Sequence, residues 1–124
     1  MLIMLIHLYI LHIFHTFAYQ KQKYMSKEIL YRGGEDNNPN FLWLSTSKSY
    51  ASQYGDVKEY KISIDILDKL CDEHKSFDYV IADVDEYPLY ETDNLNIDKM
   101  KADGYSGYYY IEDEYNCINV CLFK

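Results

Sequence analysis

The spacing of hydrophobic and polar residues divides most of the chain into short strands. Residues 28–32 (EILYR) and 41–44 (FLWL) predict two apolar strands, separated by the turn-forming residues GGEDNNPN. Apolar and polar residues alternate in residues 57–65 (VKEYKISID), so we expect a half-buried strand there. Two more apolar runs, 105–111 and 117–123, flank the acidic turn EDEYN and predict a final pair of strands.

Three segments between these strands predict short helices. Residues 48–54 (KSYASQY) come directly after the triplet Ser45–Ser47, which suits a strand exit and a helix N-cap, and Gly55 suits the C-cap. Residues 65–74 (DILDKLCDEH) predict a second helix, and residues 96–104 (NIDKMKADG) a third that ends at its glycine. Together the elements predict an α+β fold with antiparallel strand pairing.

Residues 1–19 (MLIMLIHLYILHIFHTFAY) are far more hydrophobic than the remainder of the chain. One interpretation is a mis-assigned start codon, with translation beginning at Met25. A second is a membrane segment, which needs about 20 apolar residues and would here contain three histidines; a third is a packed helix. We therefore treat residues 1–24 as an apolar N-terminal extension and residues 25–124 as one domain with a single core.

The domain is strongly acidic. The whole chain has a formal net charge of -8, and because residues 1–24 carry two lysines and no acid, residues 25–124 carry -10. Such a domain repels phosphate backbones, which bind lysine and arginine. We therefore expect no direct binding to nucleic acid.

The cysteine content favours a reducing compartment. Cys71, Cys117 and Cys121 are odd in number and have no CxxC spacing, which is typical of a cytoplasmic protein without disulfides. Cys117 and Cys121 are separated by an even number of residues, so they should share one face of a strand. We predict buried thiols that act as small hydrophobic residues, and no metal site.

A set of short motifs carries a resemblance to a known family. LYRGG, FLWLSTS, the helix KSYASQYG, EYKISI and DGYSGYYYIEDE occur in the order found in the ADP-ribosyltransferase fold. In its arginine-serine-glutamate class, an arginine ends the first strand, a Ser-Thr-Ser triplet ends the second, and an acidic pair lies near the C-terminus. The matching residues here are Arg32, Ser45–Ser47 and the pair Glu112 and Glu114.

The stretch GYSGYYYIEDEYNCINVCLF also resembles the C-terminal part of small phage-encoded anti-CRISPR ADP-ribosyltransferases. The resemblance covers about residues 29–64 and 96–123, and each motif is short. It implies split antiparallel β-sheets with a few short helices, and NAD as the substrate.

The resemblance assigns NAD-binding roles to residues near the first two strands. The Arg32 guanidinium offers planar donors to phosphate or ribose oxygens, and Gly33 with Gly34 lets backbone amides approach the ligand. The Ser45 hydroxyl would hold the ribose or orient the catalytic carboxylate. The remaining candidates fix the strand-to-helix corner or stack on the nicotinamide ring: Thr46 and Ser47 for the corner, and Tyr50 or Tyr54 for the ring.

The catalytic carboxylate is expected in the acidic turn. Cleavage of the glycosidic bond passes through an oxocarbenium-like state that a nearby carboxylate stabilises. Glu112 or Glu114 would supply it, with Asp113 as a further alternative. In many family members the glutamate begins the last apolar strand, where this chain has Asn119; if Asn119 is the catalytic position, the protein binds NAD without transferring from it.

Each motif also has a simpler interpretation. Arg32 would pair with an acid at the surface, the Ser-Thr-Ser triplet would only cap a helix, and the acidic turn would only be solvated. Tyr50 and Tyr54 would belong to the core. The order and spacing of the motifs together favour the family resemblance over these separate explanations.

The sequence therefore predicts a mono-ADP-ribosyltransferase that moves ADP-ribose from NAD to a protein acceptor. The resemblance implies a viral or phage anti-defence effector that modifies a host protein in the cytoplasm, or at a membrane if residues 1–19 are genuine. Two alternatives remain open: a catalytically inactive relative that acts as an acidic protein-binding inhibitor or decoy, and an enzyme that hydrolyses NAD without an acceptor.

Overall fold

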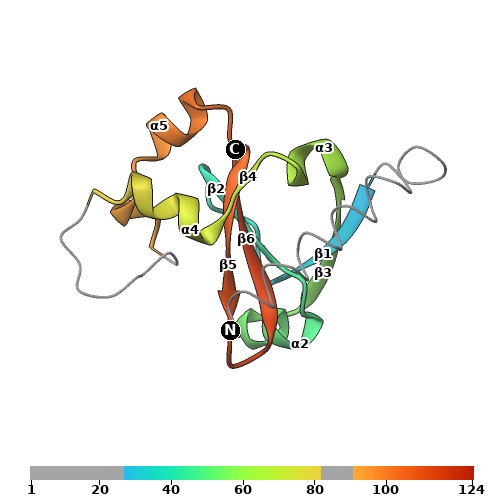
Figure 1. Ribbon diagram of the computed structural model, residues 1–124. Helices are drawn as coiled ribbons and strands as arrows, with labels where there is room; N and C mark the ends of the chain where they lie inside the picture. The colour runs from blue at the N-terminus through green and yellow to red at the C-terminus, as the bar shows by residue number, and fades with distance from the viewer. Residues whose placement is uncertain (1–26, 82–90) are drawn as a thin grey trace.

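A six-stranded β-sheet forms the centre of the protein (Figure 1). The computed structural model describes residues 27–81 and 91–124. The predictions about residues 1–24 and the start at Met25 lie outside the described residues. Within the described ranges, no helix is both long and apolar enough to cross a membrane.

All of the described strands except β4 match the predicted strands closely. They are β1 (Lys27–Gly33), β2 (Phe41–Ser45), β3 (Val57–Ser63), β4 (Leu70–Cys71), β5 (Gly107–Glu112) and β6 (Cys117–Phe123). The α-helices are α2 (Lys48–Ala51), α3 (Ile64–Leu67), α4 (Glu73–Ser76) and α5 (Ile97–Ala102), and the 3₁₀ helices are η1 (Ser52–Tyr54), η2 (Phe77–Tyr79) and η3 (Thr92–Asn94). The mixed α+β class predicted from the sequence is confirmed.

The single helix predicted over residues 65–74 is wrong. Leu70 and Cys71 instead form β4, which pairs in parallel with β5, and both side chains are buried. Asp72 then starts a new helix, since its carboxylate accepts a hydrogen bond from the Lys75 amide at 2.7 Å. Pairing with the sheet edge thus overrides the helical spacing of this segment.

The strand order is β3-β1-β2-β6-β5-β4, and every described pair except β4 with β5 is antiparallel. The sheet is continuous, but β1 and β2 share one register pair, Tyr31 with Ser45. By contrast, β1 pairs with β3 along its whole length, and β2 pairs with β6 over all five of its residues. The sheet therefore has a narrow junction between the antiparallel pair β1 and β3 and the other strands.

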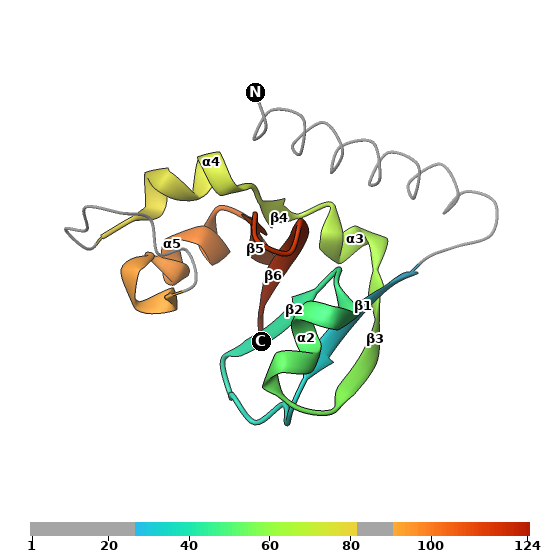
Figure 2. The same ribbon diagram turned by 90° about the horizontal axis from the view of Figure 1, so that it is seen from below.

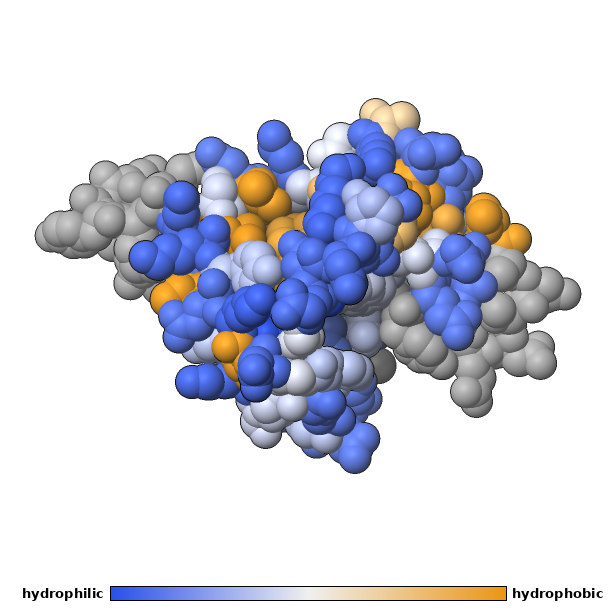
Figure 3. All heavy atoms as spheres, turned by 180° about the vertical axis from the view of Figure 1, so that it is seen from behind, coloured by the Kyte–Doolittle hydropathy of each residue, from blue (hydrophilic) through white to orange (hydrophobic). Residues whose placement is uncertain are grey.

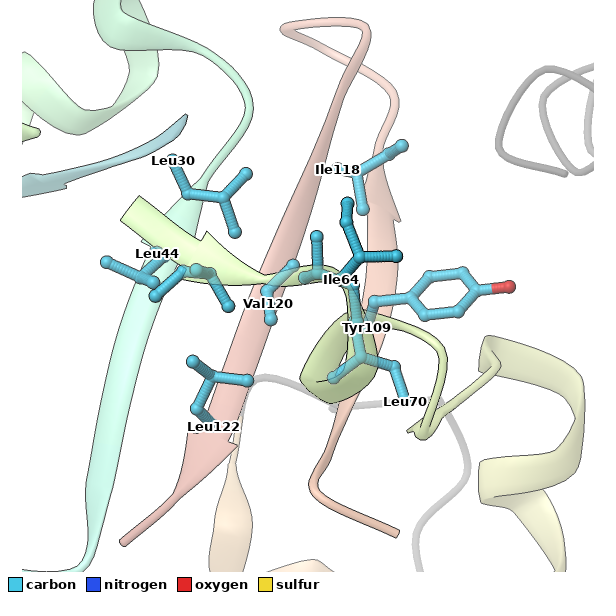
Figure 4. Packing of buried hydrophobic residues seen from close by; sticks show 10 residues of the cluster. Leu30, Leu44, Ile64, Leu70, Tyr109, Ile118, Val120 and Leu122 are labelled. Atoms are coloured by element: carbon cyan, nitrogen blue, oxygen red, sulfur yellow. The ribbon is translucent and has the colours of Figure 1, made fainter. Parts of the chain in front are cut away.

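One face of the sheet carries the main hydrophobic core. Leu44, Val120 and Tyr109 lie opposite one another on β2, β6 and β5, so their side chains point to the same face. Ile64 of α3 belongs to the same cluster, and Figure 4 shows Leu44, Val120 and Ile64 gathered between the strands and the helix, with the Tyr109 ring at the edge of the group. Successive side chains of a strand point to opposite faces of the sheet, so this face buries every second residue of these strands.

The other face carries a second cluster near α4 and α5. It contains Tyr108 and Cys121 from the strands and Met100 from α5, all fully buried. Trp43 packs edge-on against Tyr108 with ring centroids 6.0 Å apart. The prediction of buried thiols is confirmed, because Cys71, Cys117 and Cys121 are all buried and free.

Helix α2 covers a different part of this second face. In Figure 2 it lies against β1 and β2, away from α4 and α5. Figure 3 shows the molecule from behind, where hydrophilic side chains cover most of the visible surface and hydrophobic ones are scattered among them. The arrangement places α2, the β1–β2 junction and the β5–β6 hairpin around one region of the sheet.

Candidate active site

A cavity of about 550 Å³ lies at this junction. Its volume is within the roughly 300–1,000 Å³ of small-molecule sites. Five aromatic residues line it: Tyr31, Trp43, Tyr50, Tyr54 and Tyr110. The lining also includes four residues with other polar side chains, namely Arg32, Ser45, Glu112 and Asn119. Three of these four, all except Asn119, are residues to which the sequence assigned roles in NAD binding or catalysis.

The floor of the cavity is a row of side chains that crosses four strands. Tyr31 lies opposite Ser45, Ser45 opposite Asn119, and Asn119 opposite Tyr110. Cross-strand partners point to the same face of a sheet, so this row points away from the main core. Ser45 and Asn119 are each only 2% exposed. The sheet register thus brings residues from distant parts of the sequence into one site.

Arg32 lines the cavity, but much of its hydrogen-bonding capacity is used by the backbone. Its Nη1 donates to the Trp43 carbonyl at 3.2 Å, and its Nε donates to the Glu35 carbonyl at 3.2 Å. Its Nη2 also donates to the Glu35 carbonyl. Two of the five guanidinium N–H groups have no acceptor among residues 27–81 and 91–124. Arg32 therefore holds together β1, β2 and the loop that follows β1. All three bonds go to backbone carbonyls and none to the carboxylate of a surface acid.

The two glycines after Arg32 serve backbone packing. A Cβ at Gly33 would lie 1.7 Å from the Ala51 carbonyl oxygen, so only glycine lets α2 approach β1 this closely. Gly34 has φ +83°, and its amide donates to the Asp56 carbonyl at 3.0 Å. We predicted that the Gly34 amide would approach a ligand. In the structure this amide instead donates to the Asp56 carbonyl. Gly33 still lines the cavity.

The Ser-Thr-Ser triplet forms the corner between β2 and α2, as predicted. Ser47 is the N-cap of α2, and its Oγ accepts from the Tyr50 amide at 3.0 Å. The Thr46 Oγ1 accepts from the Ile118 amide at 3.0 Å, which ties the corner to β6. Neither of these side chains is part of the cavity lining, whereas the buried Ser45 is.

Helix α2 and the 3₁₀ turn after it supply one wall. Tyr50 and Tyr54 are four residues apart, and their hydroxyls lie 3.1 Å from each other. Tyr115 of the β5–β6 turn packs edge-on against Tyr50 with centroids 5.1 Å apart. Burial, and then the bond to Tyr54, raise the pKa of the Tyr50 phenol above its ordinary value. Tyr54 is 62% exposed, so it lies at the cavity mouth and not in the core.

Of the three carboxylates proposed for catalysis, Glu112 is the one that lines the cavity. It ends β5, opposite Cys117 on β6, and it is half-buried. Asp113 and Glu114 come next in the turn, where both are exposed and neither is part of the lining. Burial raises the pKa of Tyr110 and of Cys117, and the negative charge of Glu112 adds to both shifts.

Sequence reasoning missed Tyr31, Trp43 and Tyr110 as cavity residues. The signal was the period of two, because Trp43 precedes Ser45 by two residues and Tyr110 precedes Glu112 by two. Residues with this spacing share a face of a strand. Asn119 was noted as a departure from the family pattern, and its place beside Ser45 in the buried row gives it a position in the site.

A scan against models of protein families finds no match to this chain, and searches of curated proteins and of solved structures also find none.

Proposed function

We propose that this protein is a mono-ADP-ribosyltransferase that transfers ADP-ribose from NAD to a protein acceptor. The observation that carries the proposal is the convergence of Arg32, Ser45 and Glu112 on one aromatic cavity. These residues lie at the ends of three different strands, and they are the residues that the motif resemblance singles out. A surface ion pair, a helix cap and a solvated turn would have no reason to meet in this way.

The chemistry of the lining suits the substrate. NAD carries a cationic nicotinamide ring, and the faces of tyrosine and tryptophan rings attract such cations. Glu112 adds a negative charge to the same cavity. As the bond between ribose C1′ and the nicotinamide nitrogen breaks, the electron pair leaves with nicotinamide, and the positive charge that develops on the ribose is stabilised by the carboxylate.

The acceptor then completes the transfer. Its nucleophilic atom forms a bond to C1′, and its proton passes to Glu112 or to water. The two N–H groups of Arg32 that have no acceptor in the described part of the chain would donate to phosphate or ribose oxygens. Ser45 Oγ accepts from the Ser47 amide at 3.1 Å and donates to Cys117 Sγ at 3.6 Å, so its role is to hold the cavity floor in place.

The test is NAD-dependent labelling with a matched pair of variants. The protein is incubated with labelled NAD and a cell lysate, and both the labelled bands and the released nicotinamide are measured. Glu112→Gln should lower both by about 10²–10³-fold, the usual effect of removing one transition-state contact. Glu114→Gln, two residues away in the exposed turn, should leave nicotinamide release within a few-fold of wild type. Absence of both labelling and nicotinamide release in the wild-type protein would overturn the proposal.

A second candidate function rests on the charge. The chain has a net charge of -8, which favours association with a basic surface on another protein. A non-catalytic inhibitor or decoy would bind its partner through this acidic surface. Calorimetric titration with NAD separates the two functions. Measurable NAD binding favours the transferase, whereas a decoy binds its protein partner and has no need of NAD.

A further inference from the structure

A chain of hydrogen bonds runs along the cavity floor and ends at Asn119. The Ser47 amide donates to Ser45 Oγ at 3.1 Å, and this hydroxyl donates to Cys117 Sγ at 3.6 Å. The Cys117 thiol then donates to Asn119 Oδ1 at 3.7 Å. Every link runs in the same direction, from the backbone amide to the carboxamide oxygen. The orientation of the Asn119 carboxamide is therefore set by the corner between β2 and α2.

This orientation leaves the Asn119 Nδ2 group without a hydrogen-bond partner among the described residues. The side chain is 2% exposed and lines the cavity. Burial is the largest effect on the Tyr110 phenol and raises its pKa, whereas the nearby Asn119 side chain lowers that pKa. Even so, no hydrogen bond of regular geometry joins Asn119 Nδ2 to Tyr110. A buried donor without a partner destabilises a folded protein, so its presence calls for a ligand that accepts from it.

The surroundings of Asn119 decide what kind of acceptor fits. Trp43 and Tyr110 meet edge to face with centroids 6.3 Å apart, and both rings line the cavity. Glu112, two residues from Tyr110 on the same face of β5, disfavours an anionic acceptor such as phosphate. An uncharged oxygen on a planar ring satisfies the donor, the aromatic side chains and the carboxylate together.

We propose that Asn119 Nδ2 donates to the carboxamide oxygen of the nicotinamide ring of NAD and thereby selects this ring. The inference rests on the proposed function for the identity of the ligand. It assigns Asn119 as a specificity-determining residue, and Cys117 and Ser45 as positioning residues that act through it. The asparagine at this position is then a recognition group for the leaving ring, one strand away from the carboxylate that stabilises the ribose.

The test compares ligands that differ at the carboxamide. Calorimetry gives Kd for NAD, for ADP-ribose, and for 3-aminopyridine adenine dinucleotide, which carries an amino group in place of the carboxamide. Wild type should bind NAD at least about tenfold more tightly than the aminopyridine analogue. Asn119→Leu should bind NAD at least about tenfold more weakly than wild type does, and it should no longer discriminate between the two dinucleotides. ADP-ribose should bind equally to both proteins.

Stability separates recognition from a structural role. Because Asn119→Leu removes an unpaired buried donor, its midpoint of urea unfolding should equal or exceed that of wild type, even though NAD binding is weakened. Asn94→Leu, in the 3₁₀ helix η3 and outside the cavity lining, is the control and should leave all three Kd values unchanged. Should Asn119→Leu fail to fold, the side-chain amide signals of Asn119 in ¹⁵N-labelled wild type provide the same test: NAD should shift them downfield, and the aminopyridine analogue should not.

The outcomes distinguish the two proposals. Equal NAD binding and discrimination in wild type and Asn119→Leu would overturn the role of Asn119 and leave the transferase untouched. An equal loss of NAD and ADP-ribose binding would show that Asn119 contacts the ribose, which also overturns the assignment to the ring. Tight, discriminating binding of NAD without any transfer or nicotinamide release would overturn the transferase and support the recognition site. Absence of NAD binding to wild type would overturn both.

Discussion

The Arg32 guanidinium donates to the Trp43 carbonyl at 3.2 Å, and this bond crosses the junction where β1 and β2 share a single register pair. The side chain takes over part of the role of the backbone ladder that is missing there. It also lies in the cavity lining, so the same group that joins the two halves of the sheet forms part of the site. The cohesion of the sheet and the lining of the cavity therefore depend on the same side chain.

Replacing Arg32 should weaken the fold as well as any ligand binding. Arg32→Ala loses the charged hydrogen bonds to the Trp43 and Glu35 carbonyls, and we expect a drop of about 1.5–3 kcal/mol in the free energy of unfolding. Urea denaturation monitored by tryptophan fluorescence measures it. Lys61→Ala on the exposed side of β3 is the control and should change stability by less than about 0.5 kcal/mol. If both variants unfold at the same urea concentration, Arg32 does not join the strands.

Gly33→Ala should be far more destabilising than the same replacement at Gly104. The new methyl group would lie 1.7 Å from the Ala51 carbonyl oxygen, so α2 must move away from β1. We expect a loss of at least about 3 kcal/mol, the upper end of over-packing effects. At Gly104, φ is +97° and an added Cβ would meet no atom of the described residues within 4 Å apart from its neighbours in the chain, so Gly104→Ala should cost only the backbone strain of roughly 1–2 kcal/mol. Thermal unfolding of the two variants gives the comparison, and a smaller effect at Gly33 than at Gly104 contradicts the packing argument.

The N-cap of α2 should contribute measurably to stability. Ser47→Ala removes the acceptor for the Tyr50 amide, and we expect a loss of about 1 kcal/mol. Ser49→Ala, at an exposed helical position two residues later, should be neutral or slightly stabilising because alanine favours the helix. Tyr50 lies in α2 and Tyr54 in the 3₁₀ turn that follows it, so if the cavity binds NAD as proposed, NAD binding should weaken in Ser47→Ala and not in Ser49→Ala. Equal stability of the two variants in urea would count against the cap.

The buried thiols should make the protein resistant to thiol reagents and sensitive to alkaline pH. Burial raises the pKa of Cys121 to about 12, and it also raises the pKa of Cys71 and Cys117. An exposed thiol has a pKa of about 8.5, so the unfolded chain loses these protons first. The resulting stabilisation is present below about pH 8.5 and decreases as the pH rises toward the folded-state values.

Two measurements check this behaviour. The free energy of unfolding, measured in urea, should fall between about pH 8 and pH 11. At about pH 8 a thiol reagent such as DTNB should react slowly with the native protein and rapidly once urea unfolds it. Rapid reaction of Cys121 in the native protein would show that its burial does not limit access.

Much of the fold could be predicted because local pattern and tertiary structure agree. The strands β2 and β6 are almost continuous runs of apolar residues, and Ser47 and Gly55 mark the limits of the helical segment between β2 and β3. The failure at Leu70 and Cys71 has a clear physical reason. Their spacing suits a helix, but the free edge of β5 offers backbone hydrogen bonds that local propensity does not reveal.

The candidate site could be predicted in part. Arg32, Ser45 and Glu112 lie at strand ends, where motif positions were informative, and the structure brings all three to one cavity; their roles in NAD chemistry stay predictions. The direction of the hydrogen bonds that fix Asn119 depends on the register of β2 against β6, and register is a property of the assembled sheet. The backbone contacts of Arg32 likewise depend on the narrow junction between β1 and β2. The local sequence pattern does not predict this junction.

The position of β6 has a consequence for how the chain reaches its native state. The strand β6 (Cys117–Phe123) lies between β2 and β5 in the sheet and pairs with both. The ribosome synthesises β2 much earlier than β6. During translation, the edge of β2 that pairs with β6 therefore stays unpaired until residue 123 has left the ribosome. Contacts of such large sequence separation slow folding, and they expose the nascent chain to chaperones and aggregation in the meantime.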